Sequence, residues 1–266
     1  MAMQPLMQDP GLRSIPWRDL VPLRPLEVAW ELTLTLPWLV ALLACAHVGW
    51  PIPALAAAFV LFLTGLRNAH DAQHGNLGIP ASANALFMAG LSLVMLGSVH
   101  AVQVNHLRHH RYCLGDDDFE ARSARMRGWQ AILYGPVFFV MLHVHGWRHG
   151  NRRQRRWILG EVAMILAYVI FVLVARPGPA FEMHVATMVL GQCFTAFFAV
   201  WTVHHDVDEE HTIARTERGW RNTLFYGMFF HVEHHLFPRV PTPHLPSLAR
   251  RLDRVRPDLK RVTVLP

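Results

Sequence analysis

Histidines recur in this sequence at spacings that an α-helix places on one face. Residues i, i+3 and i+4 of a helix point the same way, so such a cluster presents all its imidazoles to one region. Neutral imidazole is a common ligand of transition metals. The pattern therefore predicts a metal centre. It occurs three times: His70 and His74; His106, His109 and His110; and His231, His234 and His235.

The number of histidines favours two metal ions over one. A single catalytic zinc takes about three protein ligands, whereas the three clusters together supply eight imidazoles. No cysteine pair accompanies them, so a structural zinc site of the usual thiolate kind is not supported. Imidazole binds iron, copper, zinc and nickel alike, and the clusters alone do not choose among these metals.

The other histidines and the cysteines have simpler explanations. Cys45 and Cys193 lie in apolar runs and are expected to pack as small hydrophobic residues. Cys113 follows the second cluster; packing is again expected, with a contact to a ligating histidine as the alternative. Lone histidines near apolar segments are usually hydrogen-bonded interior or interfacial residues. That interpretation applies to His47, His100, His184 and His244.

The composition indicates a membrane protein. Hydrophobic residues make up 52% of the 266 residues, charged residues only 17%, and the mean hydropathy is +0.21. This is too apolar for an ordinary soluble domain of this size. The net charge of +6 comes from arginines that flank apolar runs, which is typical of cytoplasmic membrane borders. A nucleic-acid partner is therefore not expected.

The elements that position the clusters are predicted to be membrane helices. We expect an all-α integral membrane fold, a single domain over residues 1–266, with four transmembrane helices in two hairpins and a cytosolic histidine-rich helical cap. The predicted spans are about 29–50, 54–69, 157–175 and 183–203. Proline-containing turns at 51–53 and 176–179 join the two members of each hairpin. The basic run Arg148–Arg156 places the clusters and both termini in the cytosol.

Shorter apolar segments lie between the clusters. Residues 84–99 separate the first cluster from the second, so a single crossing would put these clusters on opposite sides of the membrane. The segment must therefore be re-entrant or interfacial. The same applies to 129–147, which Gly135-Pro136 is expected to interrupt. Met1–Leu26 carries no signal-peptide pattern and is expected to be a cytosolic arm. Between Pro243 and Pro257 we expect an amphipathic helix.

The three clusters resemble the three histidine boxes of the membrane fatty acid desaturase superfamily. The boxes have the form HxxxH at His70–His74, HxxHH at His106–His110 and HxxHH at His231–His235. The resemblance covers most of the chain, from about the first span to the tail. It implies a non-haem centre of two iron ions (Fe2+/Fe3+) that activates O2 and cleaves an unactivated C–H bond. It also implies a further ligand after the last span, for which we favour His204, with His205 as the alternative.

Acidic residues near the boxes are expected to accept the free ring N–H groups of ligating histidines, which would fix the tautomer and raise basicity. We assign this role to Asp71, Asp117 and Glu233. Asp116 and Asp118 are further candidates, although the whole stretch Asp116–Asp118 has the alternative of a solvated acidic loop.

The favoured reaction is O2-dependent desaturation of a fatty acyl chain, because Leu236–Thr242 after the third box resembles acyl desaturases. The short chain also resembles carotenoid ketolases, so a lipid hydroxylase or a carotenoid ketolase or hydroxylase is the alternative. A histidine-rich metal transporter is a remote third, because the clusters lie past the span ends rather than near the midplane.

The substrate would be a lipid or an acyl thioester held in an apolar tunnel. Candidate lining residues are Phe87, Met88, Phe138, Phe139 and Phe229. Dinucleotide, flavin and iron–sulfur motifs are absent from the sequence. Electrons must then come from a separate donor such as a ferredoxin, rubredoxin or cytochrome. The Arg148–Arg156 run would suit docking of an acidic donor, although its role in membrane orientation suffices to explain it.

Overall fold

The computed structural model describes residues 9–207, 212–259 and 262–264, and helices dominate this part of the chain. This confirms the predicted helical class. Three helical segments are long and apolar enough to cross a membrane, or up to five if each of two bent pairs counts as one span. The two ends of the chain, Met1 and Pro266, lie outside the described residues, as does the start of the predicted N-terminal arm.

The first predicted hairpin corresponds to α2 (Pro25–Thr33), α3 (Leu36–His47) and α4 (Pro51–His74). Together α2 and α3 form the first candidate span, and α4 forms the second. The first candidate span is interrupted between the end of α2 at Thr33 and the start of α3 at Leu36. The break lies just before Pro37, because a proline ring clashes with the carbonyl of residue i−4 in a helix. Pro51 opens α4 rather than lying in the turn, as suits a first helical position.

The second predicted hairpin also has helices on both sides of its turn. α8 (Arg152–Ala175) is a candidate span, and α9 (Pro179–Gln192) follows after Arg176 and Gly178, both of which have positive φ. The returning segment then bends by 43° into the π-helix η4 (Ala196–Trp201), which continues as α10 (Thr202–His204). This bent pair occupies the position of the predicted fourth span.

The segment between the first two histidine clusters turns back on itself. α5 (Ala81–Met95) and α6 (Val99–Tyr112) meet at 109°. Leu96 has a left-handed backbone at the end of α5, and the Ser98 side chain caps α6 by accepting from the Ala101 N–H. This bend has the geometry that the re-entrant prediction for residues 84–99 required.

The predicted interruption at Gly135-Pro136 is wrong, because α7 (Gly128–His149) runs through both residues. Close packing explains why the helix persists there. A Cβ atom on Gly135 would lie 1.5 Å from the Cys193 carbonyl oxygen, so glycine is what lets α7 approach the end of α9. Gly146 similarly permits close approach to Ala101 of α6. Such tertiary contacts offset the intrinsic helix-breaking tendency of the pair.

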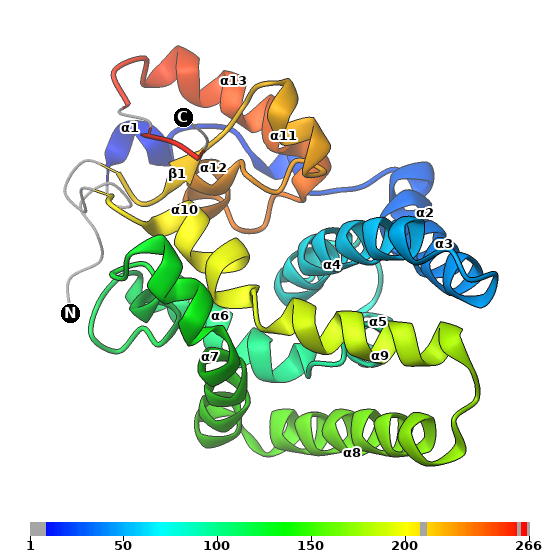
Figure 1. Ribbon diagram of the computed structural model, residues 1–266. Coiled ribbons are helices and arrows are strands. Elements are labelled where there is room, and N and C mark those ends of the chain that lie inside the picture. The colour runs from blue at the N-terminus through cyan, green and yellow to red at the C-terminus, as the bar shows by residue number, and fades with distance from the viewer. Residues whose placement is uncertain (1–8, 208–211, 260–261, 265–266) are drawn as a thin grey trace.

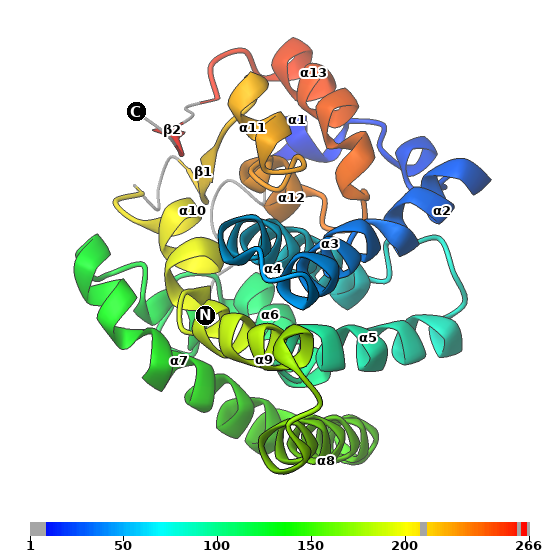
Figure 2. The ribbon, with the colours of Figure 1, turned by 45° about the vertical axis from the view of Figure 1, so that its right-hand side comes forward.

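The remaining elements gather on the side of the molecule opposite α8 (Figures 1 and 2). The predicted tail helix is present as α13, with Leu245, Leu248 and Leu252 buried. β1 and β2 form a two-residue parallel pair in which Arg215 is opposite Val262. The elements of this cap are α1 (Pro10–Arg13), η2 (Arg18–Leu20), η3 (Glu120–Arg122), β1 (Arg215–Thr216), α11 (Trp220–Leu224), α12 (His231–Leu236), η5 (Thr242–His244), α13 (Leu245–Val255) and β2 (Val262–Thr263).

Two large apolar clusters hold these parts together. One lies within the candidate spans and joins α3, α4, α5 and α9 around residues such as Leu61 and Met188. The other lies under the cap and joins α12 and α13 to α7 through residues such as Leu248, Val232 and Phe138. Of the helices that carry the histidine clusters, α4 packs in the first apolar cluster and α12 in the second, while α6 contributes to both through Val99 and Val102.

Candidate metal centre

Nine histidines from four helices converge in two groups. Within each group the candidate ligand atoms all lie within 4.8 Å of one another. The five-histidine group contains His70, His74, His106, His110 and His234; the four-histidine group contains His109, His204, His231 and His235. These are the nine histidines that the sequence predicted, and the structure brings all of them together.

Neighbouring histidines in one box serve different groups. His109 and His110 are adjacent on α6 but belong to the four- and five-histidine groups respectively, and His234 and His235 on α12 divide in the opposite order. Consecutive residues of a helix point about 100° apart, so an HH pair reaches two centres at once. The third box thereby joins the two groups across α12.

The spacing of the ring nitrogens matches ligands around metal ions. In the five-histidine group, His106 Nε2 lies 3.0 Å from His74 Nε2, and His110 Nε2 lies 2.9 Å from His234 Nε2. In the four-histidine group, His204 Nε2 lies 3.0 Å from the Nε2 atoms of both His109 and His231. Two ligands about 2.1 Å from one ion at right angles are about 3.0 Å apart. The donor set and its spacing therefore fit two metal ions.

Unpaired nitrogens point to the same conclusion. Among the described residues, the buried His70 Nε2 has no hydrogen-bond partner, although a buried polar atom left unpaired costs about 1–3 kcal/mol. The His70 ring lies against His106 and His234, with centroids 4.7 and 4.0 Å apart. A metal ion in the five-histidine group would satisfy this nitrogen.

The carboxylates that hold the ligands differ from those predicted. Asp118 accepts from His109 Nδ1 at 2.7 Å and from the Leu114 N–H at 2.9 Å. Glu120 lies 3.3 Å from His106 Nδ1. Asp118 was only a secondary candidate in the sequence and Glu120 was missed. Glu120 lies 14 residues after His106. The only feature of the sequence that could have indicated it is that it is an acidic residue soon after the second box.

The assignments of Asp71, Asp117 and Glu233 to ring N–H groups are corrected by the structure. Asp71 accepts from the Thr242 hydroxyl at 3.0 Å. Glu233 is fully buried and accepts from Thr216 and Arg218. Asp117 is exposed in the loop after α6. Asp71 is adjacent to His70 on α4, and Glu233 is adjacent to His234 on α12. Neighbouring residues of a helix point in different directions, so these two carboxylates point away from the histidine groups.

The structure distinguishes the two candidates for the additional ligand. His204 is buried, and its Nε2 joins the four-histidine group while its Nδ1 lies 3.3 Å from the Ile213 carbonyl oxygen. His205 instead stacks on Trp201, with ring centroids 3.8 Å apart, and its Nδ1 lies 2.7 Å from the Trp201 carbonyl oxygen. The histidines set aside from the sequence are also elsewhere; for example, His100 bonds to Glu161 and His244 to the Leu20 carbonyl.

The environment keeps the imidazoles of the third box neutral. Burial, reinforced by neighbouring imidazoles, lowers the pKa of His231, His234 and His235 well below the usual 6.5. A neutral ring has the free lone pair that metal binding requires. Burial also raises the pKa of Glu120 to about 8, so this carboxyl is protonated at neutral pH unless a nearby cation lowers its pKa.

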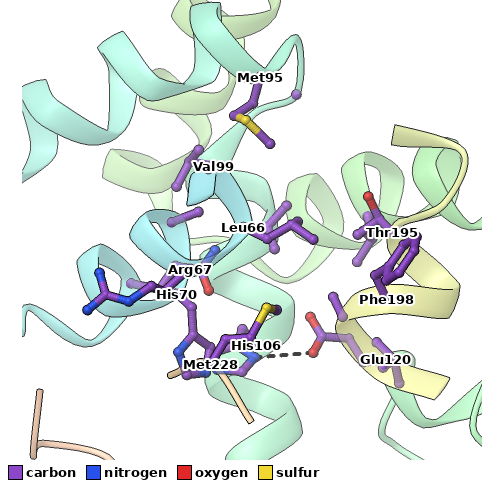
Figure 3. Close-up of a pocket in the computed structure, with 18 of the residues that line it drawn as sticks. Leu66, Arg67, His70, Met95, Val99, His106, Glu120, Thr195, Phe198 and Met228 are labelled. Atoms are coloured by element: carbon purple, nitrogen blue, oxygen red, sulfur yellow. Dashed lines mark hydrogen bonds and ion pairs between the residues drawn. The ribbon is translucent and has the colours of Figure 1, made fainter. Parts of the chain in front are cut away.

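An apolar cavity opens onto both histidine groups (Figure 3). His70, His106, His231 and Glu120 line it together with the apolar residues Leu66, Met95, Val99, Phe198 and Met228, and Met228 lies beside His70 and His106 in Figure 3. Of the five residues predicted to line a tunnel, Phe138 takes part. Phe87 and Met88 pack in the core of the spans, Phe229 packs against Val203, and Phe139 lies near Gly97. The arrangement places an apolar cavity beside the two histidine groups.

Comparison with known proteins agrees with this arrangement. The chain matches the family described as fatty acid desaturase over residues 36–264. It is 31% identical over 224 residues to a β-carotene ketolase from Paracoccus sp., covering 79% of this chain and 84% of the relative. It is 29% identical over 191 residues to a β-carotene ketolase from a second Paracoccus strain, covering 67% of this chain and 70% of that relative.

The family and the candidate spans together indicate an integral membrane enzyme, which argues against the metal-transporter alternative. The family is a di-iron one, in keeping with histidine groups that could each hold a metal ion. The three histidine boxes, their convergence and the match over residues 36–264 show that the chain belongs to the fatty acid desaturase family.

Proposed function

We propose that this protein is a di-iron, O2-dependent oxygenase that converts a ring or chain methylene of a carotenoid to a ketone. The observation that carries the proposal is the apolar cavity opening onto two adjacent groups of four and five imidazoles. The relatives named β-carotene ketolases favour ketone formation over the acyl desaturation expected from the third box.

The histidine groups suit iron in this role. Imidazole binds iron readily, and no thiolate is among the nine candidate ligands. When bound, the iron pair would supply the activation of O2 and the removal of hydrogen from an unactivated C–H bond. Asp118 and Glu120 would orient ligand rings by accepting their outer N–H groups.

The cavity residues would position the substrate and exclude water. Leu66, Val99 and Met228 surround the space beside the imidazoles with apolar groups, which holds a hydrocarbon in place without a polar anchor. Confinement of the reacting carbon within reach of the centre lowers the entropic part of the barrier. The apolar wall also limits side reactions with water.

The overall reaction needs electrons that this chain does not store. Each hydroxylation inserts one oxygen atom of O2 into a C–H bond and reduces the other to water, consuming two electrons and two protons. A second round at the same carbon gives a geminal diol, which loses water to form the ketone. We propose a separate ferredoxin, rubredoxin or cytochrome as donor. Five exposed arginines in Arg148–Arg156 support docking of an acidic partner.

The proposed topology has four spans in two hairpins, with one domain over residues 1–266. In this arrangement α2–α3, α4, α8 and the bent α9–α10 segment cross the membrane, while α5–α6 turns back at its 109° bend. The same exposed arginines, at the end of α7 and the start of α8, support a cytosolic location of the cap.

Expression in a bacterial host that accumulates β-carotene tests the proposal, with His234→Ala as the inactive control. Mass spectrometry of extracted pigments should show products that have gained one oxygen and lost two hydrogens per ketone, absent from the control. Products that gain oxygen alone would indicate a hydroxylase. Unchanged carotenoid together with acyl chains that have lost two hydrogens would replace the ketolase proposal with the desaturase.

A further inference from the structure

Phe198 separates the cavity at the histidines from a second apolar hollow on the outer surface of the spanning helices. The outer groove is lined by Leu55, Phe59 and Phe62 of α4, by Leu190 of α9 and by Phe194, which follows the end of α9, among others. Phe198 of η4 lines both spaces. In Figure 3 its side chain is seen on the inner face, close to Thr195.

The sizes of the two spaces show that the inner one does not hold a long substrate by itself. The inner cavity has a volume of about 100 Å³, which is smaller than a cavity of roughly 150 Å³ that holds one benzene ring. The outer groove adds about 320 Å³. A hydrocarbon whose reacting end lies beside the imidazoles must therefore extend elsewhere, and the groove begins on the other side of one aromatic ring.

The outer groove is accessible from the hydrocarbon region of a membrane. The side chains at its rim are apolar and exposed: Leu55 is 50%, Phe59 48% and Leu190 58% exposed. The groove lies between α4, a candidate span, and α9, part of a bent candidate span. Exposed apolar surface of this kind is favourable in lipid and costly in water.

The local structure around Phe198 suits a movable barrier. Its ring contacts Phe59 and Phe62 edge-on, with centroids 5.9 and 6.1 Å apart, and its side chain is only half-buried. It lies in a π-helical turn just after the 43° bend, and such turns are frequent at functional sites. Gly191 leaves the groove open, because a Cβ there would lie 3.0 Å from the Phe62 ring.

We propose that Phe198 is the gate of a lateral substrate portal. A long apolar substrate leaves the bilayer between α4 and α9, occupies the outer groove, and passes its reacting end into the inner cavity when the Phe198 ring rotates aside. The occupant is the hydrocarbon oxidised at the histidine groups, so this inference rests on the proposed function. Phe198 acts as a positioning and specificity residue and not as a metal ligand.

Photochemical labelling tests the portal without requiring turnover. The whole protein, and separately its His234→Ala variant, is placed in lipid nanodiscs with a hexadecane derivative bearing a terminal diazirine. Cross-linked residues are mapped by mass spectrometry. We expect label on Leu55 and Leu190 in the groove and on Leu142 and Met228 in the cavity. Excess β-carotene should reduce the cavity label in both proteins.

Substitutions at Phe198 should change the cavity label in opposite directions. Phe198→Trp should reduce it by about tenfold, which corresponds to about 1.4 kcal/mol on the barrier, while the groove label stays unchanged. Phe198→Ala should raise the cavity label. A protein that merely misfolds would not give this opposed pair. Phe171→Trp, on an exposed position of α8 outside both spaces, is the matched control and should change neither label.

The possible outcomes separate the portal from the proposed function. An amount of cavity label that is the same in Phe198→Trp, Phe198→Ala and the wild type would overturn the gate. A second outcome would also overturn the gate: label in the groove that neither β-carotene nor the Phe198 variants change, with no label in the cavity. That result would show that the probe meets the groove only from the surrounding lipid. Labelling as expected from a protein that oxidises no carotenoid would retain the portal and reject the ketolase assignment.

Discussion

The four-histidine group is enclosed and braced by protein groups, whereas the five-histidine group is only partly enclosed. All four histidines of the first are buried, but three of the five in the second are only half-buried. Asp118 holds His109 at 2.7 Å, and the Ile213 carbonyl and Cys113 Sγ lie near the outer nitrogens of His204 and His235. In the five-histidine group, by contrast, the buried His110 Nδ1 has no partner among the described residues.

This difference suggests that the two centres are preorganised to different degrees. Ligands held by second partners keep their orientation without a metal, whereas unbraced ligands depend on the metal to order them. The five-histidine group also contributes His70 and His106 to the cavity, against His231 alone from the other group. We therefore expect the less braced centre to be the more exchangeable one and to contact more of the substrate space.

Removal of one ligand from either group should have the largest effect. We expect His109→Ala and His234→Ala each to lower ketone formation by at least about a hundredfold, because each loses a direct metal contact. Metal analysis of the purified variants should show less bound iron. His244→Ala, whose ring bonds to the Leu20 carbonyl outside both groups, should retain both properties. Full activity of His234→Ala would contradict the metal assignment.

The support beneath the five-histidine group can be broken without touching a histidine. Arg67, one turn before His70 on α4, donates to both carboxylate oxygens of Glu31 and to the Tyr226 carbonyl. Glu31→Ala leaves a buried guanidinium without its partner, so we expect a loss of about 3–5 kcal/mol in unfolding free energy, measured in detergent.

The exposed pair between Arg176 and Glu182 provides the control for this substitution. Glu182→Ala should cost less than about 1 kcal/mol. Replacing both buried partners, as Glu31→Leu with Arg67→Met, should recover much of the lost stability. Equal losses from Glu31→Ala and Glu182→Ala would show that the buried pair does not support α4.

The carboxylates give a direct test of unequal bracing. Asp118→Asn should weaken metal binding at the four-histidine group by about 10–100-fold, because the amide is a poorer acceptor for the His109 N–H. Glu120→Gln should have a smaller effect, under about tenfold, because its contact with His106 is longer at 3.3 Å. Chelator competition measures both. A larger loss in Glu120→Gln would reverse the comparison.

Among these changes, replacement of the thiol near His235 should have the smallest effect on metal affinity. Cys113 Sγ lies 3.8 Å from His235 Nδ1, and sulfur is a weak hydrogen-bonding partner. We expect Cys113→Ser to change metal affinity by less than about threefold. Cys193→Ser, at a position bonded to the Val189 carbonyl away from the centre, is the control. A tenfold loss in Cys113→Ser alone would make the thiol an essential part of the bracing.

Local sequence spacing identified eight of the nine grouped histidines, and the family resemblance added His204, but neither predicted their division into two groups. The i, i+3, i+4 pattern identified histidines that share a helix face. The assignment of His109 and His110 to different groups depends on how α6 meets α4 and α12, which no local pattern encodes. Asp118, rather than Asp117, bonds His109 because the loop after α6 turns residue 118 inward, and this too depends on tertiary packing.

The helical class and the candidate spans followed from hydropathy, and the need to bring the clusters to one side predicted a re-entrant or interfacial segment over residues 84–99, without locating its bend. The continuity of α7 was not, because it depends on Gly135 meeting the Cys193 carbonyl, a contact between segments far apart in sequence. Propensity describes a residue's local preference, and packing against distant segments decides the outcome.

The most direct test of two separate centres is the iron content of the purified protein, measured per chain beside a variant that lacks His204, His231 and His235. The two histidine groups predict about two iron ions per chain in the wild type and about one in the variant, with the five-histidine group still loaded. One iron ion per chain in the wild type, or complete loss of iron in a folded variant, would contradict the division into two centres.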